Sequence, residues 1–224
     1  QITAWETNND DSKYVKVQLL NSLVLLLSKS SFTAQVIESK NAEGDVIVPT
    51  FLTHDLKRYT ITSIGENAFY DNQKIKSLSF DPDSCVQTIG NFAFQDSSIS
   101  SLSIPASLVE MGGEWCHKVA HLTEISVDER NPHFKFDKEN GLLIKNDKEI
   151  AFCVRDKKGL VHIPKNIGRI NRWSFYKCNQ LMSFINDSSS LNFIDSYAFS
   201  ECSKLLNFSI NKVGKLTLNS YSFA

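Results

Sequence analysis

One six-residue pattern recurs through the chain and constrains its fold more than any other feature. An aliphatic residue, here called the anchor, is followed by Gly, Asn or Asp, two variable positions, a small residue and usually Phe. The copies begin at Ile64, Ile89, Met111, Ile170, Ile194 and Leu218. The intervals between these anchors are 25, 22, 59, 24 and 24 residues. A repeat of this length predicts a solenoid, in which each repeat forms one coil that packs on its neighbours.

Three positions, counted from the anchor, carry the structural constraints. Position +1 holds Gly, Asn or Asp, which tolerate a positive φ best, so we expect a left-handed turn there. Position +4 is small and position +5 is Phe, except for Trp115 and Cys116 in the third copy. This predicts tight packing under the next coil and a stacked aromatic spine. The residues with these repeat roles are Gly65, Phe69, Gly90, Phe94, Gly112, Asn171, Phe175, Asp195, Phe199, Asn219 and Phe223.

Each complete repeat continues with a short segment in which apolar and polar residues alternate. Alternation with a period of two marks a half-buried strand, so the polar residues should face solvent and align from coil to coil. In residues 181–186 the register is open, because either Phe184 or Ile185 can point inward. The predicted contact face consists of Ser77, Ser79, Ser101, Ser103, Glu124, Ser126, Asn207 and Ser209.

Two regions depart from the repeat. Residues 1–60 lack the pattern but read as short strands at 14–19, 32–37 and 45–48, with the aliphatic run 23–27 as a further buried strand. We expect them to form the β cap that the first coil of a solenoid requires.

The second departure is the interval of 59 residues after Met111, eleven longer than two repeats of 24. Asn140-Gly141 separates two apolar segments in this interval and is a strong hairpin signal. We therefore expect a modified coil that carries a β-hairpin. The predicted organisation is a cap at 1–60 and repeats at 61–224, with coils near 61–88, 89–110, 111–127, 128–169, 170–193, 194–217 and 218–224.

The segment from Ile89 to Pro105, with its parallels from Ile64 and Ile194, resembles the BspA-like leucine-rich repeats, also called the Treponema pallidum type. The insert and the entry segment resemble protist members in particular. The resemblance implies a mainly β, curved leucine-rich-repeat solenoid with short helical or loop segments and an N-terminal β cap. It also implies a surface protein, because members are associated with cell surfaces and with adhesion to host or matrix proteins.

Several function classes find no support in the sequence. The 24 basic and 25 acidic residues form no basic block, so nucleic acid and anionic membranes are not expected partners. The longest aliphatic run, five residues, is far below the ~20 needed to span a bilayer. No nucleophile or phosphate-loop motif occurs, and the exposed strand positions are mostly Ser. We therefore expect no catalytic residues and no cofactor.

Cysteine and histidine residues suggest two further sites, each with a plainer alternative. Cys178 and Cys202 are one repeat apart, so they either form a disulfide between adjacent coils or stack as buried thiols. We favour buried thiols, because stacked side chains point the same way. Cys116, His117 and His121 suggest zinc, but no fourth ligand is evident, so we expect a divergent repeat corner and no metal.

Asn186 and Asn207 match the glycosylation sequon, and we expect Asn186 to lie in a loop and Asn207 on a strand. Aromatic residues also recur at position +3, where they either pack between coils or form an exposed stripe. The members of this column are Phe92, Trp173, Tyr197 and Tyr221.

The sequence thus favours a non-catalytic, protein-binding module on a cell surface or secreted, with a host, matrix or cell-surface protein as its ligand. The odd number of cysteines, five, keeps a cytoplasmic scaffold open. A solenoid hydrolase or lyase is the third alternative. Because the last copy stops at Ala224, before its strand, we expect either a longer array or a partner over the open coil.

Overall fold

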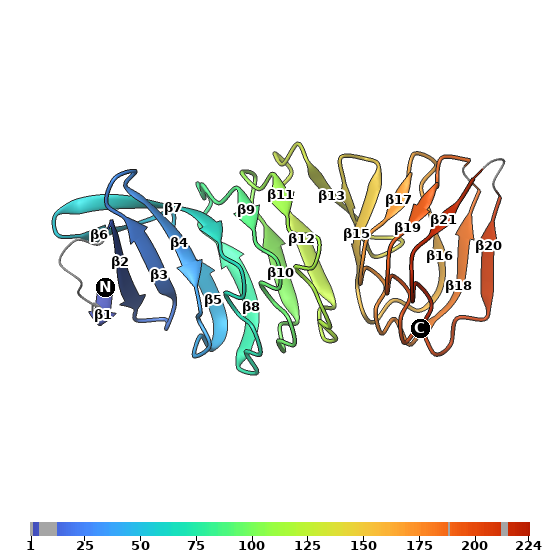
Figure 1. Ribbon diagram of the computed structural model, residues 1–224, viewed down its shortest axis with the longest axis horizontal. Helices are drawn as coiled ribbons and strands as arrows, with labels where there is room; N and C mark the ends of the chain where they lie inside the picture. The colour runs from blue at the N-terminus through green and yellow to red at the C-terminus, as the bar shows by residue number, and fades with distance from the viewer. Residues whose placement is uncertain (1, 5–12, 188, 212–214) are drawn as a thin grey trace. The chain divides into compact units, whose positions relative to one another are not determined.

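The computed structural model describes residues 2–4, 13–187, 189–211 and 215–224. Every regular element in these residues is a β-strand (Figure 1). The solenoid is therefore confirmed as a β fold, but the short helical segments expected beside the strands are loops and turns. The chain forms two compact units, Gln1–Val119 and Ala120–Ala224. Residue 60, the expected end of the cap, lies inside the strand Lys57–Ile64 of the first unit.

The first unit combines an antiparallel entry with parallel coils. Its strands are β1 (Ile2–Ala4), β2 (Tyr14–Leu19), β3 (Val24–Ser28), β4 (Thr33–Ile37), β5 (Gly44–Val48), β6 (Phe51–His54), β7 (Lys57–Ile64), β8 (Ile75–Phe80), β9 (Thr88–Ile89), β10 (Ser101–Ile104) and β11 (Glu110–Met111). One sheet has the order β1-β2-β3-β4-β7-β9-β11, with β6 paired to β7. The pairs from β1 to β4 are antiparallel, the pairs β4–β7, β7–β9 and β9–β11 are parallel, and β6 pairs with β7 antiparallel. A second parallel ladder joins β5, β8 and β10.

The aliphatic run at 23–27 lies in β3 and its approach, as a strand of the antiparallel entry. Its burial alternates: Leu23, Leu25 and Leu27 are fully buried, whereas the residues between them are half-buried. Alternation of this kind places one face of the strand on the core. The expected buried strand is therefore present, but only one of its faces is buried.

The first coil begins before the first recognisable copy of the pattern. Strand β4 pairs in parallel with β7, and Val36 lies opposite the anchor Ile64. The amide of Gly65 donates to the carbonyl of Val36 at 2.7 Å, as each later +1 amide does to the preceding anchor. Val36 therefore acts as an anchor within the segment assigned to the cap.

The second unit contains the insert and the last coils. Its strands are β12 (Glu124–Val127), β13 (Phe134–Asp137), β14 (Leu142–Lys145), β15 (Glu149–Cys153), β16 (Gly159–His162), β17 (Arg169–Ile170), β18 (Leu181–Asn186), β19 (Phe193–Ile194), β20 (Asn207–Ile210) and β21 (Thr217–Leu218). Strands β13 and β14 form the expected hairpin around Asn140-Gly141, where Gly141 has a φ of 68°. Strand β15 adds a third antiparallel strand that the sequence did not indicate. Parallel ladders continue as β15-β17-β19-β21 and β16-β18-β20.

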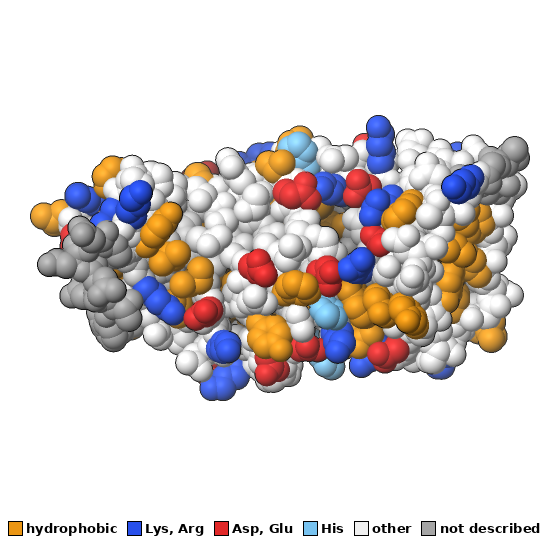
Figure 2. Space-filling view, viewed as in Figure 1, with side chains coloured by type: hydrophobic (Ala, Val, Ile, Leu, Met, Phe, Trp, Pro, Cys, Tyr) orange, Lys and Arg blue, Asp and Glu red, His pale blue; other side chains and the backbone are white. Residues whose placement is uncertain are grey.

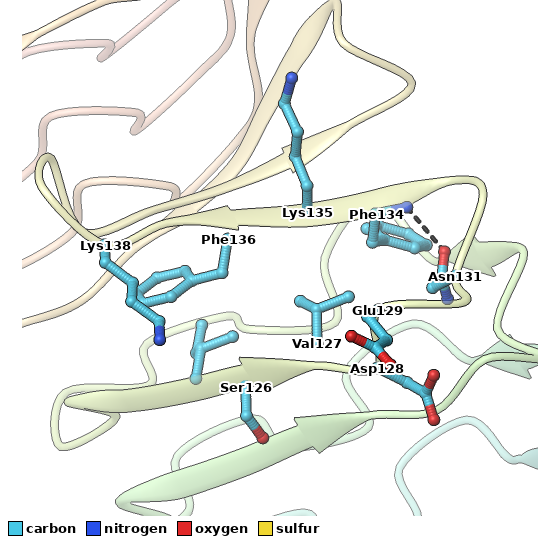
Figure 3. A pocket seen from close by; sticks show the side chains of 10 residues that line it. Ser126, Val127, Asp128, Glu129, Asn131, Phe134, Lys135, Phe136 and Lys138 are labelled. Carbon is cyan, nitrogen blue, oxygen red and sulfur yellow. Dashed lines mark hydrogen bonds between the residues drawn. The ribbon is translucent and has the colours of Figure 1, made fainter.

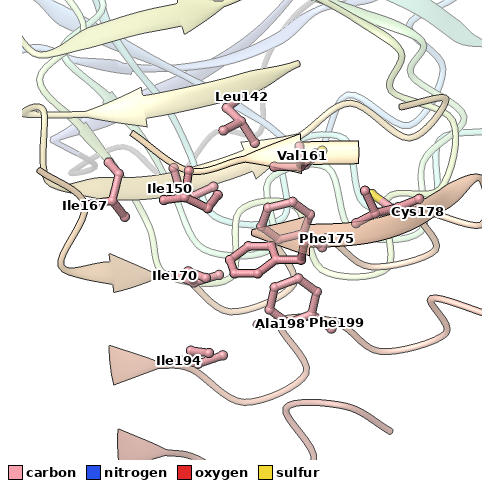
Figure 4. Packing of buried hydrophobic residues seen from close by; sticks show 14 of the residues in the cluster. Leu142, Ile150, Val161, Ile167, Ile170, Phe175, Cys178, Ile194, Ala198 and Phe199 are labelled. Carbon is pink, nitrogen blue, oxygen red and sulfur yellow. The ribbon is translucent and has the colours of Figure 1, made fainter. Parts of the chain in front are cut away.

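A coil hidden in the sequence accounts for the long interval after Met111. Ile150 in β15 lies opposite the anchor Ile170 of β17, and its carbonyl accepts the Asn171 amide at 3.0 Å. Figure 4 shows Ile150, Ile170 and Ile194 one below another in the core of the unit. The interval therefore contains one further anchor.

Positions +4 and +5 have the roles that the sequence predicts. The small +4 residues are all buried, and the +5 rings stack at 5.3 Å for Phe69–Phe94 and 4.6 Å for Phe175–Phe199. Phe199 also stacks on Phe223, at 5.2 Å. Within each unit the aromatic spine is therefore confirmed.

The conformation expected at position +1 is wrong. None of Gly65, Gly90 and Gly112 has a positive φ. The chain turns at positions +3 and +7 instead. The left-handed residues there are Asn67, Asp71, Phe92, Asp96, Lys118, Trp173, Lys177, Tyr197, Glu201 and Tyr221.

Candidate protein-binding face

The predicted face of the first unit consists of aligned columns of small polar side chains. Ser77 of β8 lies opposite Asp45 of β5 and Ser101 of β10, and its hydroxyl donates to the Asp45 carboxylate at 2.7 Å. Ser79 lies opposite Ile47, which is 54% exposed. All four predicted serines, including Ser103, are half-buried because neighbouring columns shield them. Asp45 and Ile47 extend this face onto β5, which sequence reasoning assigned to the cap.

The corresponding face of the second unit is chemically different. Asn207 of β20 lies opposite Ser183 of β18 and donates to its hydroxyl at 3.3 Å, and Ser209 lies opposite Ile185. Phe184 is fully buried, which settles the register left open by the sequence in favour of an inward Phe184. On β16 the same face continues with Leu160 and with His162, whose Nε2 lies 2.7 Å from an Asp187 oxygen. Glu124 and Ser126 are exposed on β12. The second face is therefore mixed rather than serine-rich.

Charge is dispersed over the surface visible in Figure 2. Acidic and basic side chains lie among each other there, without a patch of one sign. This agrees with the formal net charge of −1. Long-range electrostatic steering of a highly charged ligand is therefore not a property of this side of the molecule.

The aromatic column at position +3 combines both of the roles considered for it. Trp173 stacks on Tyr197 at 4.5 Å, and Tyr197 stacks on Tyr221 at 5.4 Å, so the rings pack between coils. Exposure rises along the column, from a buried Trp173 to a Tyr221 that is 66% exposed. In the first unit Phe92 is half-buried and contacts the ring of His117.

Residues 53–136 and 148–224 match the BspA type leucine rich repeat region, in six copies. The chain belongs to the BspA-type leucine-rich repeat family. Similar solved structures include the T. pallidum leucine rich repeat protein, with a TM-score of 0.48 and 15% identity over 92% of this chain and 90% of that chain. A leucine rich cell surface protein from Faecalibacterium prausnitzii has a TM-score of 0.45 and 15% identity, over 92% of this chain and 77% of that chain. The pneumococcal vaccine antigen PcpA has a TM-score of 0.41 and 16% identity, over 94% of this chain and 70% of that chain. No curated protein matches the chain significantly.

The cysteines of these BspA-type repeats are free thiols. Cys178 and Cys202 are not bonded to each other, as the favoured alternative predicted. Cys153 of the hidden coil is buried in the same unit. Burial raises the pKa of the Cys202 thiol to about 12 and that of Cys153 well above its usual value. Cys153 and Cys202 therefore pack as small apolar side chains and are poor nucleophiles. Burial also raises the pKa of the Cys178 thiol, but its hydrogen bond with Cys153 and the Arg155 charge outweigh burial and leave this pKa below the usual value.

A buried arginine, which sequence reasoning missed, lies beside the thiols. The guanidinium of Arg155 donates to the carbonyls of Cys153, Trp173 and Ser174 at 3.2, 3.0 and 2.8 Å. It also lies over the ring of Phe152, with its central carbon 4.0 Å from the centroid. Its charge is therefore compensated by carbonyl dipoles and an aromatic face. No repeat pattern marks this position, because Arg155 belongs to the insert.

The Cys116, His117 and His121 cluster does not gather into a metal site. Cys116 is fully buried, whereas His121 is exposed. Among the described residues no group of three His, Cys, Asp or Glu side chains is arranged to hold a metal ion. In the same residues no helix is long and apolar enough to cross a membrane.

The two sequons lie in different surroundings. Asn186 ends β18 and has an exposed fraction of 0%, so the loop expected around it is wrong and its amide is not accessible in the folded chain. The alternation of β18 turns Asn186 inward together with Phe184. Asn207 is exposed on β20, as expected, with its amide donated to Ser183.

Proposed function

We propose that this chain is a non-catalytic module that binds another protein through the outward face of its parallel strands, and that it works at a cell surface. The observation that carries the proposal is the pair of serine columns on β8 and β10, which Asp45 and Ile47 continue on β5, and in which Ser77 lies opposite both Asp45 and Ser101. Membership of the BspA-type repeat family supports a binding role, because repeat arrays present extended surfaces of aligned side chains.

The chemistry of the serine columns suits a protein ligand. A hydroxyl donates one hydrogen bond and accepts others. The Ser77 hydroxyl already donates to Asp45, so toward a ligand it acts as an acceptor for a backbone amide. Short side chains that are already half-buried lose little conformational entropy when a partner covers them. The exposed Ile47 adds an apolar contact at the β5 edge, typical of the apolar centres that anchor interfaces.

The proposed ligand is a host, matrix or cell-surface protein, and the proposed location is the cell surface or the extracellular space. A cytoplasmic scaffold is the second candidate, and the observation that favours it is the set of five free thiols. Protease treatment of intact cells that express the full-length protein separates the two. Cleavage of the repeat region supports the surface location, and complete protection supports the scaffold.

The face is tested by a triple replacement of Ser79, Ser103 and Ser126 with Arg. Three long cationic side chains would block close approach, so we expect attachment to cells or matrix to fall about tenfold or more, as for loss of interface residues worth ~1.4 kcal/mol together. The matched control places three Arg residues at exposed positions outside strands, Asn41, Asn166 and Ser220. Equal attachment by both variants, with both folded, would remove this face from consideration.

A further inference from the structure

A small cavity with four apolar side chains in its lining lies beside the inserted hairpin in the second unit. Its volume is about 290 Å³, and it opens between β12 and β13 (Figure 3). Ile125 and Phe134 are buried at its base, and Val127 and Phe136 are half-buried at its walls. The cavity is at the small end of ligand sites, which span roughly 300–1,000 Å³. It therefore fits one side chain rather than a whole cofactor.

Strand periodicity explains why these four side chains meet. Ile125 and Val127 are two residues apart on β12, and Phe134 and Phe136 are two residues apart on β13, so each pair shares one face of its strand. The turn between the strands is held by Asn131, whose side-chain oxygen accepts the His133 and Phe134 amides at 2.7 Å. The apolar lining is thus a consequence of the insert and occurs where the repeat pattern is interrupted.

Two charged side chains at the rim are available to a ligand. Lys138 and Glu129 are exposed, and neither side chain forms a hydrogen bond or ion pair within the described residues. Figure 3 shows them toward opposite ends of the cavity, with Lys138 beside Phe136 and Glu129 beyond Val127.

The other charged groups of the lining are already engaged. Asp128 accepts two bonds from the Arg130 side chain, at 2.8 and 2.9 Å, and these bonds hold its pKa at about 2. Lys135 is paired with Asp147. Lys138 is therefore the cation of the lining that can meet a carboxylate without breaking an existing pair.

We propose that this cavity binds an aromatic side chain of a partner protein segment in which the adjacent residue is acidic. The ring contacts Ile125, Val127 and Phe136, the carboxylate pairs with Lys138, and Glu129 accepts a backbone amide at the other end. This inference deepens the proposed function and rests on it, because it supplies a side-chain preference for a protein ligand. Ser126 lines the cavity as well, so a double variant, Ser79→Arg with Ser103→Arg, tests the serine columns of β8 and β10 with the cavity lining intact, and the two proposals can fail independently.

The direct test is titration of the methyl-labelled chain with acetyl-Phe-Asp-amide, followed by NMR at Ile125 and Val127. We expect saturable shifts at these two methyl groups. Acetyl-Ala-Asp-amide lacks the ring and acetyl-Phe-Asn-amide lacks the charge, so both should bind about fivefold more weakly or worse. Free phenylalanine binding as tightly as the dipeptide would overturn the assignment to a protein segment.

Reversing the charge of Lys138 at the rim provides a second test of the proposal. Lys138→Glu should weaken acetyl-Phe-Asp-amide about fivefold and strengthen acetyl-Phe-Lys-amide. Lys158→Glu is the matched control, because Lys158 is exposed in the same unit and lies outside the lining. Absence of saturable shifts, or an equal effect of both variants, would overturn the proposal. If attachment still depends on the serine columns in that case, the proposed function survives alone.

Discussion

Gly90 and Gly112 stand where the backbones of successive coils approach most closely. A Cβ on Gly90 would lie 2.6 Å from the amide nitrogen of Glu66, and one on Gly112 would lie 2.6 Å from that of Asn91. These distances are too short for any side chain, so glycine at +1 reflects close packing rather than a left-handed turn. The pattern correctly indicates a constrained position, but residue type alone does not distinguish a steric cause from a conformational one.

We predict that Gly90→Ala destabilises the chain by about 2 kcal/mol or more, because its new methyl group meets backbone that cannot move aside. Gly113→Ala is the matched control, since nothing lies within 4 Å of the place that its Cβ would occupy and its φ is not positive. Urea unfolding of both variants measures the difference. Equal stability of the two would contradict the close-approach explanation.

In the second unit the +1 column holds polar side chains that bond to one another. Asp195 accepts from Arg169 at 2.6 Å and from Asn219 at 2.9 Å. Burial raises the pKa of Asp195, but the Ser196 amide, Asn219 and Arg169 together outweigh burial and leave it below the usual value. A lowered folded-state pKa gives stability above the unfolded pKa of about 3.9, and this stability is lost as the pH falls through the folded-state pKa.

Asp195→Asn should therefore be less stable than the parent protein near pH 7, and the difference should shrink as the pH falls below about 4. The reason is that acid protonates the parent carboxylate and removes the same charged interactions. Urea unfolding between about pH 3 and pH 7 checks this. A stability difference that does not change with pH would show that the Asp195 charge makes no contribution.

Among the elements, the copies of the pattern correctly predict the strands and the aromatic spine, and Asn140-Gly141 correctly predicts the hairpin, but two coils contain no recognisable copy. Ile150 and Val36 act as anchors without the residues that identify the others, because Ala151 and Ile37 follow them instead of Gly, Asn or Asp. Hydrogen bonds from the next coil fix the positions of these two anchors. No local sequence pattern predicts those bonds. The cavity between β12 and β13 could not be predicted from the sequence for the same reason, because it depends on how the insert folds back.

Arg155 joins the hidden coil to the next one. We predict that Arg155→Met lowers the free energy of unfolding by about 3 kcal/mol. The change leaves the carbonyls of Cys153, Trp173 and Ser174 without this buried donor, while methionine roughly preserves the volume over Phe152. Lys158→Met, at an exposed position of the same unit, is the control. Thermal and urea unfolding compare the two variants. A loss of less than about 0.5 kcal/mol, the usual effect of a surface substitution, would contradict the buried role of Arg155.

At the scale of the molecule, family membership and the β solenoid follow from the repeat, whereas the ligand does not. The serine columns of β8 and β10 were predictable because alternation fixes which side chains face outward. The mixed face of the second unit was not, because Leu160 and His162 belong to the insert's own coil. The proposed binding role therefore rests on the known arrangement of side chains on this surface, and the protein ligand is part of the proposal.

Successive coils are held together by hydrogen bonds between equivalent positions. The amides of Phe69, Phe94, Phe175 and Phe199 each donate to the +4 carbonyl of the next coil, at 2.7, 3.1, 2.8 and 2.7 Å. Amide hydrogen exchange measured by NMR tests this most directly, because a buried, bonded amide exchanges only when the coils separate. We predict slow exchange at all four amides. Exchange at these amides as fast as in exposed loops would contradict the stacked-coil account.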